Sequence, residues 1–199
     1  MKIIVIGATG TIGRAVSAAL GAKHEVVGAS RKGDVTANIE DIGSLRKLFE
    51  RVTNVDAVVC CAGDAVFKPL SQLTDADFQL GIKSKLTGQV HLVRVATGHL
   101  QEGGSITLTG GSLAHEPVKG GAAISMVNAG LEGFVAGAAI EMPRQIRLNL
   151  VSPPWLSETL AALKMDPSGG ISAASCAKAY VAAVEGKYQG QTLDARKFA

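Results

Sequence analysis

The sequence predicts an α/β fold, a doubly wound parallel β-sheet with helices on both faces. Short runs rich in β-branched residues alternate with helical runs along all 199 residues. Apolar residues make up 47% of the chain and aromatic residues only 4%, a mixture that suits buried parallel strands covered by alanine-rich helices. No repeat or linker divides the sequence, so we expect residues 1–199 to form one domain.

The expected elements alternate in order along the chain. The first strand is Ile3–Ile6, and the first helix is Arg14–Leu20. Later strands are expected at Glu25–Ala29, Val55–Cys61, Ser105–Thr109, Arg147–Val151 and Gln191–Asp194. Later helices are expected at Ile42–Val52, Thr74–His99, Ala122–Met142 and Ala173–Glu185, with Asp41 and Thr74 as N-caps.

The segment after the second strand breaks this alternation. Only Ser30–Gly33 separates the second strand from the extended-looking piece Asp34–Thr36. Because a parallel crossover takes a dozen or more residues, Asp34–Thr36 is not expected to be a regular parallel neighbour of the second strand. We therefore expect the third strand and its crossover helix to be reduced or missing, which leaves this edge of the sheet open.

Three glycines follow the first strand, in the run Gly7, Ala8, Thr9, Gly10, Thr11, Ile12 and Gly13. A strand, a tight turn and a helix place backbone N–H groups where they can hold a phosphate. Gly7 allows the turn, Gly10 the approach of a pyrophosphate, and Gly13 the packing of the helix near the strand. This pattern predicts a dinucleotide site; the alternative is an ordinary strand-to-helix turn.

Composition excludes several classes of partner. The formal net charge is only +3, and no cluster of basic residues interleaved with aromatic ones indicates a nucleic-acid surface. Cys60 and Cys61 are adjacent and Cys176 is distant in sequence. This spacing indicates neither a disulfide framework nor a set of metal ligands. Without a signal-like segment before Gly7 or an apolar run of about 18 residues, we expect a soluble, cytoplasmic protein that binds no membrane.

Four further segments carry a resemblance to the short-chain dehydrogenase/reductase family, and they are Val58–Gly63, Lys85–Gly88, Val127–Phe134 and Ile146–Pro153. They are similar to the family's Asn-Asn-Ala-Gly, its Asn-Leu-x-Gly, the helix that begins Tyr-x-x-x-Lys, and Ile-Arg-Val-Asn-x-Val-Ser-Pro-Gly. The resemblance spans nearly the whole chain and implies a Rossmann-like fold. It also implies a homodimer or homotetramer, and a nicotinamide cofactor held by the glycine turn together with Ala62, Gly63 and Pro153.

The family's catalytic residues are replaced in this chain. The alignment puts Ile124 at the position of the proton-transferring tyrosine, Asn128 at that of the lysine, and Lys85 at that of the asparagine. The serine position falls on Gly111 or, with a shift of one residue, on Ser112. Isoleucine has no proton to transfer, so the usual mechanism cannot operate as it does elsewhere in the family.

We predict Lys85, Ser112 and Asn128 as the catalytic set. A lysine desolvated beside a cofactor titrates near neutrality, and Asn128 can accept from a ribose hydroxyl. The alternatives are a solvated lysine for Lys85 and a turn serine for Ser112. His115 is a further candidate proton donor, although a surface histidine is the simpler interpretation. Tyr180 we interpret as a packing residue far from the site.

The end of the second strand favours NADP(H) over NAD(H). The acidic residue that binds the ribose 2′-hydroxyl in NAD enzymes is absent there, and Ser30 and Arg31 can donate to a 2′-phosphate. Asn38 and Ile39 stand where the family contacts adenine, and the side-chain oxygen of Asn38 can accept from the adenine amine. The sequence therefore predicts an NADP(H)-dependent oxidoreductase acting on a small carbonyl or alcohol. The alternative is an NADP(H)-binding sensor or scaffold without turnover.

Overall fold

The computed structural model describes residues 1–199 and contains one seven-stranded, all-parallel sheet in the order β3-β2-β1-β4-β5-β6-β7. Its strands are β1 (Lys2–Ile6), β2 (Glu25–Ser30), β3 (Val35–Thr36), β4 (Val55–Cys60), β5 (Leu100–Thr109), β6 (Arg147–Ser152) and β7 (Thr192–Asp194).

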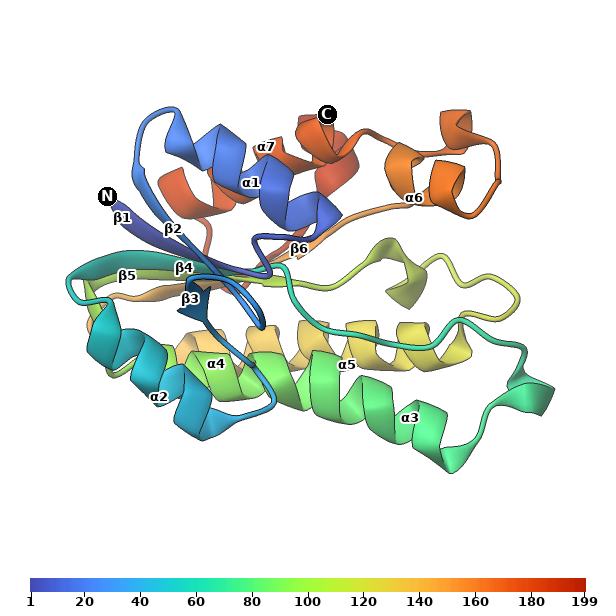
Figure 1. Ribbon diagram of the computed structural model, residues 1–199, viewed down its shortest axis with the longest axis horizontal. Coiled ribbons are helices and arrows are strands. Elements are labelled where there is room, and N and C mark those ends of the chain that lie inside the picture. The colour runs from blue at the N-terminus through green and yellow to red at the C-terminus, as the bar shows by residue number, and fades with distance from the viewer.

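Helices cover both faces of this sheet (Figure 1). Two of them, α1 (Thr11–Gly21) and α7 (Ala173–Glu185), lie on one face, and α2 (Ile42–Arg51), α4 (Gly88–Ala96) and α5 (Ala122–Ala138) lie on the other. Strand β1 supplies both cores, because side chains alternate along a strand: Ile3 and Val5 join the α1–α7 core, and Ile4 and Ile6 the opposite one. The predicted Rossmann-like α/β fold is confirmed.

The third strand is rudimentary, as expected, and no helix joins it to β2. The expectation that it would not pair in parallel is wrong, since Val35 pairs with Ala29 and Thr36 with Ser30 in parallel register. The reason is the length of β3, which has only two residues. It starts beside the end of β2, so the chain does not have to return along a full strand and a short loop is enough.

The long helix predicted at Thr74–His99 consists of three segments, α3 (Asp75–Gly81), η2 (Ile82–Thr87) and α4. Thr74 caps α3 in a reciprocal capping box with Asp77. The middle segment η2 is a π-helix, a wider turn that often occurs at functional sites. Lys85 lies within it.

Strand β5 begins at Leu100, earlier than predicted, where Leu100 pairs with Val55 before a shift in register. Gly103, with φ of +71°, and Gly104 break the alternation that would have indicated a strand there. After β6 the chain extends beyond the edge of the sheet and forms a short helix, α6 (Ser157–Ala162) (Figure 1). The remaining turns are the 3-10 segments Leu70–Gln72, Ser112–Ala114, Ala139–Glu141, Pro167–Gly169 and Ala195–Phe198.

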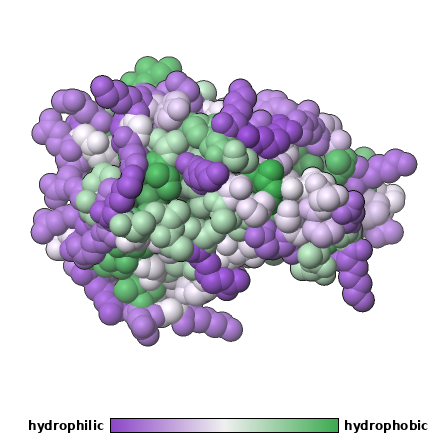
Figure 2. Space-filling view, turned by 90° about the horizontal axis from the view of Figure 1, so that it is seen from above, coloured by the Kyte–Doolittle hydropathy of each residue, from purple (hydrophilic) through white to green (hydrophobic).

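One helical stretch, Ala122–Glu141, has the length and apolarity of a membrane span. In the fold it lies along the sheet, with Val127, Leu131 and Val135 buried. Core helices of soluble proteins share this composition, so the stretch is weak evidence for a membrane. On the face formed by α1 and α7, strongly apolar side chains lie in separate patches between hydrophilic ones (Figure 2).

Candidate active site

The turn between β1 and α1 requires glycine at two of its three glycine positions. Gly7 has φ of +82°, and a Cβ on Gly13 would lie 2.0 Å from the carbonyl oxygen of Gly7. A Cβ on Gly10 would meet only that same oxygen, at 3.4 Å, so packing does not require glycine there. Gly10 therefore leaves open space at the N-terminus of α1, as the close approach of a phosphate requires.

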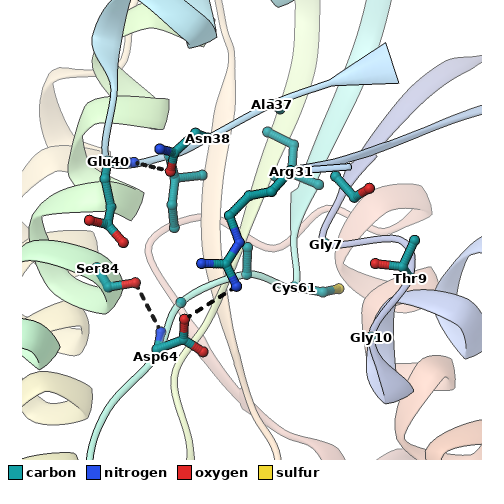
Figure 3. A pocket seen from close by; sticks show the side chains of 15 residues that line it. Gly7, Thr9, Gly10, Arg31, Ala37, Asn38, Glu40, Cys61, Asp64 and Ser84 are labelled. Atoms are coloured by element: carbon teal, nitrogen blue, oxygen red, sulfur yellow. Dashed lines mark hydrogen bonds and ion pairs between the residues drawn. The ribbon is translucent and has the colours of Figure 1, made fainter. Parts of the chain in front are cut away.

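A first cavity, of about 210 Å³, lies beside this turn, and we call it the glycine-turn cavity (Figure 3). It is built at the carboxyl ends of β1, β2 and β4, where the strand order of the sheet reverses. Nine of the predicted cofactor residues line it, namely Gly7, Thr9, Gly10, Ser30, Arg31, Asn38, Ile39, Ala62 and Gly63.

The Arg31 guanidinium reaches across the glycine-turn cavity and lies 3.6 Å from the Asp64 carboxylate (Figure 3). Both side chains are largely exposed, at 68% and 60%, so this pair stabilises the fold little. Arg31 is therefore available to a bound anion. A shallower cavity next to it is lined by Thr9, Ser30, Arg31 and Lys32, which bring two cations and two hydroxyls together.

The side chain of Asn38 is engaged in a local turn. Its Oδ1 accepts from the backbone N–H of Glu40 at 3.2 Å, and its own N–H donates to Ser44 Oγ at 3.0 Å. The oxygen that we expected to accept from adenine thus already holds the loop that follows β3. Ile39 lies behind it, in contact with Gly88 of α4.

A second cavity, of about 240 Å³, contains the predicted catalytic set, and we call it the Lys85 cavity. Lys85, Ser112 and Asn128 all line it, together with Ile124. The two cavities adjoin, because Gly63, which lines the glycine-turn cavity, packs against Lys85, which lines the other one. Of the predicted cofactor residues, Ile12 and Pro153 line the Lys85 cavity, whereas Thr11 is exposed at the start of α1 and Gly13 is buried in packing.

Lys85 is half-buried, which rules out the alternative of a solvated lysine. Its Nζ donates to the carbonyl oxygen of Gly110 at 3.0 Å, and Gly63 packs against its stem. Burial of the ammonium lowers the pKa of Lys85 to about 8, against smaller opposing effects of Cys60 and Asp64. The neighbouring Lys83 is the exposed lysine, 3.6 Å from Glu40.

Three successive carbonyl groups, of the last residue of β5 and the two residues after it, each accept from a helical side chain. Gln89 Nε2 donates to the carbonyl oxygen of Thr109 at 2.9 Å, Lys85 Nζ to that of Gly110, and Asn128 Nδ2 to that of Gly111 at 3.2 Å. Gln89 Oε1 also accepts from the backbone N–H of Thr109 at 2.9 Å. These bonds fix the loop that forms the floor of the Lys85 cavity.

The other two predicted catalytic residues differ in how they are held. Asn128 is buried, and its Oδ1 has no hydrogen-bond partner in the protein. An unpaired buried acceptor at a cavity wall is stabilised by a donor from a ligand. Ser112 begins a 3-10 turn, and its backbone N–H donates to the carbonyl oxygen of Pro153 at 2.9 Å. Ser112 is thus a turn serine that also lines the cavity, and its catalytic role stays a prediction.

His115 and Tyr180 occupy different positions from the catalytic set. His115 is exposed and 2.6 Å from Glu132 Oε2, outside the cavity lining, so the surface interpretation is right. Tyr180 is a packing residue, as expected, but it is not far from the site. Its hydroxyl donates at 2.8 Å to Thr109 Oγ1, which itself donates to the carbonyl oxygen of Cys60 at 2.5 Å.

Several site residues were not predicted from the sequence. Asp64 directly follows the segment Val58–Gly63, and Glu40 directly follows Ile39, where the family contacts adenine. Both could therefore have been predicted as site residues from their neighbours. Gln89 lies one helical turn beyond Lys85 in a mostly apolar helix. That spacing could have indicated that Gln89 lies on the same face as Lys85 and close to the site. No sequence pattern indicated Thr159 or Leu156, which reach the Lys85 cavity only because α6 folds over it.

These residues fit a nicotinamide adenine dinucleotide cofactor. The glycine turn leaves room for a pyrophosphate, Arg31 and Lys32 supply cations at the end of β2, and Asn128 presents an unpaired acceptor at the far end. The fold and the glycine turn together define a nucleotide-binding α/β protein, in which a second cavity lies beside the nucleotide site.

Comparison with known proteins places the chain in a family. A family model described as enoyl-(acyl carrier protein) reductase matches residues 5–185, which is most of the chain. The chain belongs to the short-chain dehydrogenase/reductase family, whose members are oxidoreductases that bind a nicotinamide cofactor.

Solved structures agree with this assignment. The crystal structure of the protein lin1944 from Listeria innocua is 42% identical with a TM-score of 0.93, and the match covers 98% of each chain. A small-chain dehydrogenase in complex with NADPH is 25% identical with a TM-score of 0.85, and the match covers 98% of this chain and 95% of that one.

Curated relatives are more distant and longer. Hydroxynaphthalene reductase-like protein Arp2 of Metarhizium brunneum is 27% identical over 130 residues, which are 62% of this chain and 49% of the relative. Hydroxynaphthalene reductase arp2 of Aspergillus fumigatus is 29% identical over 117 residues, 58% of this chain and 42% of the relative. The chain thus spans about half the length of the curated relatives it matches.

Proposed function

We propose that the protein is an NADP(H)-dependent oxidoreductase that interconverts a small carbonyl compound and its alcohol, with Lys85 as the proton-transferring residue. The observation that carries this proposal is the position of Lys85 Nζ, hydrogen-bonded to Gly110 at the wall of the cavity where Ile124 replaces the family's tyrosine. Burial brings the pKa of this ammonium to about 8, close to the pH at which a general acid works well.

The preference for NADP(H) rests on the end of β2. Ser30 offers a hydroxyl donor and Arg31 and Lys32 offer cationic donors to a 2′-phosphate, and no carboxylate lines the shallow cavity that these residues share with Thr9. A structural relative at 25% identity binds NADPH, which supports the same choice. NAD(H), which lacks the phosphate, is the weaker ligand in this proposal.

The bound cofactor, in its reduced form, supplies the hydride for the carbonyl carbon. Lys85 Nζ gives its proton to the carbonyl oxygen as negative charge develops there, and the Gly110 carbonyl keeps the ammonium in place. Ser112 Oγ donates to the same oxygen and orients it. Asn128 Oδ1 accepts from a ribose hydroxyl of the cofactor, which satisfies its unpaired lone pairs.

A second candidate function is an NADP(H)-binding sensor or scaffold without turnover. Ile124 favours it, since the usual proton donor is absent. A small-molecule substrate, a cytoplasmic location and the absence of nucleic-acid or membrane partners complete the primary proposal.

Trp155 allows one experiment to separate the two functions. It is the only tryptophan in the chain, and it lines the Lys85 cavity. We expect energy transfer from Trp155 to bound NADPH on titration, with NADH binding more weakly. The oxidation of bound NADPH is then followed with a panel of aldehydes and ketones. Tight binding without turnover supports the sensor, and no binding of either cofactor overturns both functions.

A further inference from the structure

Two aromatic side chains meet at the mouth of the Lys85 cavity. The rings of Phe67 and Trp155 are 5.7 Å apart between centroids and inclined at 79°, an edge-to-face pair. Trp155 lines the cavity, whereas Phe67 comes from the loop after β4 and is 50% exposed. A half-exposed phenylalanine beside a cavity retains apolar surface that a ligand can cover.

The position of Phe67 is built by its neighbours. The backbone N–H of Lys68 donates to the carbonyl oxygen of Gly120 at 2.9 Å, which ties this loop to the segment before α5. Lys68 Nζ also donates to the Asp77 carboxylate at 2.9 Å. A Cβ on Gly120 would lie 3.2 Å from the Phe67 ring, so the ring rests directly on this glycine. Phe67 therefore lies between Trp155, which lines the cavity, and Gly120.

Three exposed large apolar residues lie close in sequence to this pair or to Gly120. Leu70 follows Phe67 by three residues, Val118 precedes Gly120 by two, and Met126 lies in α5. Inside, Lys85 is the one charged side chain that lines the cavity, and no carboxylate lines it. The site thus lacks a partner for a cationic ligand and offers few donors for a polyol.

We propose that Phe67 and Trp155 select a carbonyl compound whose aromatic ring is attached directly to the reacting carbonyl. The carbonyl lies at Lys85 and Ser112, and the flat ring lies against the aromatic pair. Lys85, Ser112 and Trp155 line the same cavity of about 240 Å³, so a small ligand with its ring next to the carbonyl can contact all three. The inference rests on the proposed function, because it assigns the substrate class of the same site.

Acetophenone and cyclohexyl methyl ketone test this directly, since they share one skeleton and differ in ring aromaticity. Their dissociation constants are measured by calorimetry, for the protein alone and with saturating NADP⁺. We expect acetophenone to bind about three- to tenfold more tightly, the range for an added aromatic pair. We expect Phe67→Leu to remove that difference.

Phe198→Leu is the matched control. Phe198 forms an edge-to-face pair with Tyr188, at 6.4 Å between centroids and 82°, away from the residues of the Lys85 cavity. This variant is expected to keep the preference for acetophenone. Equal binding of the two ketones, tighter binding of the saturated one, no binding of either, or an unchanged preference in Phe67→Leu would each overturn the inference.

The oxidation of NADPH by bound ketone is a separate readout. A preference for acetophenone that disappears in Phe67→Leu supports the inference even where NADPH is not consumed, and the proposed function then fails alone. Turnover of aliphatic ketones without any preference for the aromatic ring overturns the inference and leaves the proposed function intact.

Discussion

Lys85 Nζ donates to the carbonyl oxygen of Gly110 at 3.0 Å and so joins the π-helical segment η2 to the loop after β5. The bond holds an ammonium group at a cavity wall that Ile124 also lines. In most of the family, by the resemblance of these segments, a tyrosine stands at Ile124 and an asparagine at Lys85. In the proposed function, the proton-carrying group therefore lies on a different helical segment from the tyrosine of most family members.

Lys85→Met is expected to lower turnover by about 10²- to 10⁴-fold, the usual contribution of a general acid. NADPH affinity, measured by energy transfer from Trp155, is expected to change little. Lys83→Met is the control, because Lys83 is exposed and two residues away. Undiminished turnover in Lys85→Met would remove this residue from the chemistry.

The pH dependence of turnover should follow the pKa of Lys85, which burial lowers to about 8. Reduction needs the protonated amine, so its kcat should be constant below about pH 8 and fall about tenfold per pH unit above it. Oxidation of the alcohol needs the free amine and should rise toward a plateau above that pH. Initial rates in both directions across this range give the two profiles, and profiles without an inflection near pH 8 contradict the assignment.

Arg31→Leu is expected to weaken NADPH binding about ten- to hundredfold, because a charged hydrogen bond to the 2′-phosphate is lost. NADH affinity should be nearly unchanged. Arg46→Leu, an exposed arginine of α2 outside both cavities, is the control.

Asp64→Asn acts in the opposite direction, since Asp64 competes for Arg31 at 3.6 Å. It should tighten NADPH binding by up to about fivefold, in line with the small energy of an exposed ion pair. Equal losses of NADPH and NADH affinity in Arg31→Leu would contradict a role at the 2′-phosphate.

Gln89→Leu leaves both backbone groups of Thr109 without their partner at a buried position. The free energy of unfolding is expected to fall by about 2–4 kcal/mol, from two unsatisfied buried groups. Urea denaturation measures this loss. Gln79→Leu, at an exposed position of α3, should change it by less than about 0.5 kcal/mol.

The homodimer or homotetramer that the family resemblance implies stays a proposal, and the outer faces of α4 and α5 are its expected interface. Gly133 and Gly137 have no atom within 4 Å of an added Cβ, and with Phe134 and Met142 they line an open groove. Gly130 instead packs against Leu86 of its own chain. Light scattering should give a mass of at least twice 20.4 kDa.

Gly137→Arg should shift that mass to the monomer, whereas Gly21→Arg should not. Gly21 has an equally open position at the end of α1, on the opposite face of the sheet. A monomeric wild-type chain would contradict the proposal.

Much of the fold was predictable because its signals are local. Runs such as Ile3–Ile6 and the N-caps Asp41 and Thr74 depend only on neighbouring residues, and Asp41 and Thr74 do cap α2 and α3. The parallel pairing of β3 was missed because we expected a parallel connection to need a dozen or more residues. That expectation holds for strands of ordinary length and not for a strand of two residues. Gln89 was missed because its partner, Thr109, lies 20 residues away along the chain.

The sequence by itself determined the α/β class, the glycine turn and the replacement of tyrosine by isoleucine at position 124, because each depends on residue type and spacing. Only the tertiary structure decided that Lys85 is half-buried and bonded to Gly110, that Gln89 and Tyr180 support Thr109, and that Phe67 meets Trp155. Burial and hydrogen bonding depend on which distant segments the sheet brings together. The pKa of Lys85, and with it the proposed chemistry, is therefore set by packing that no local pattern specifies.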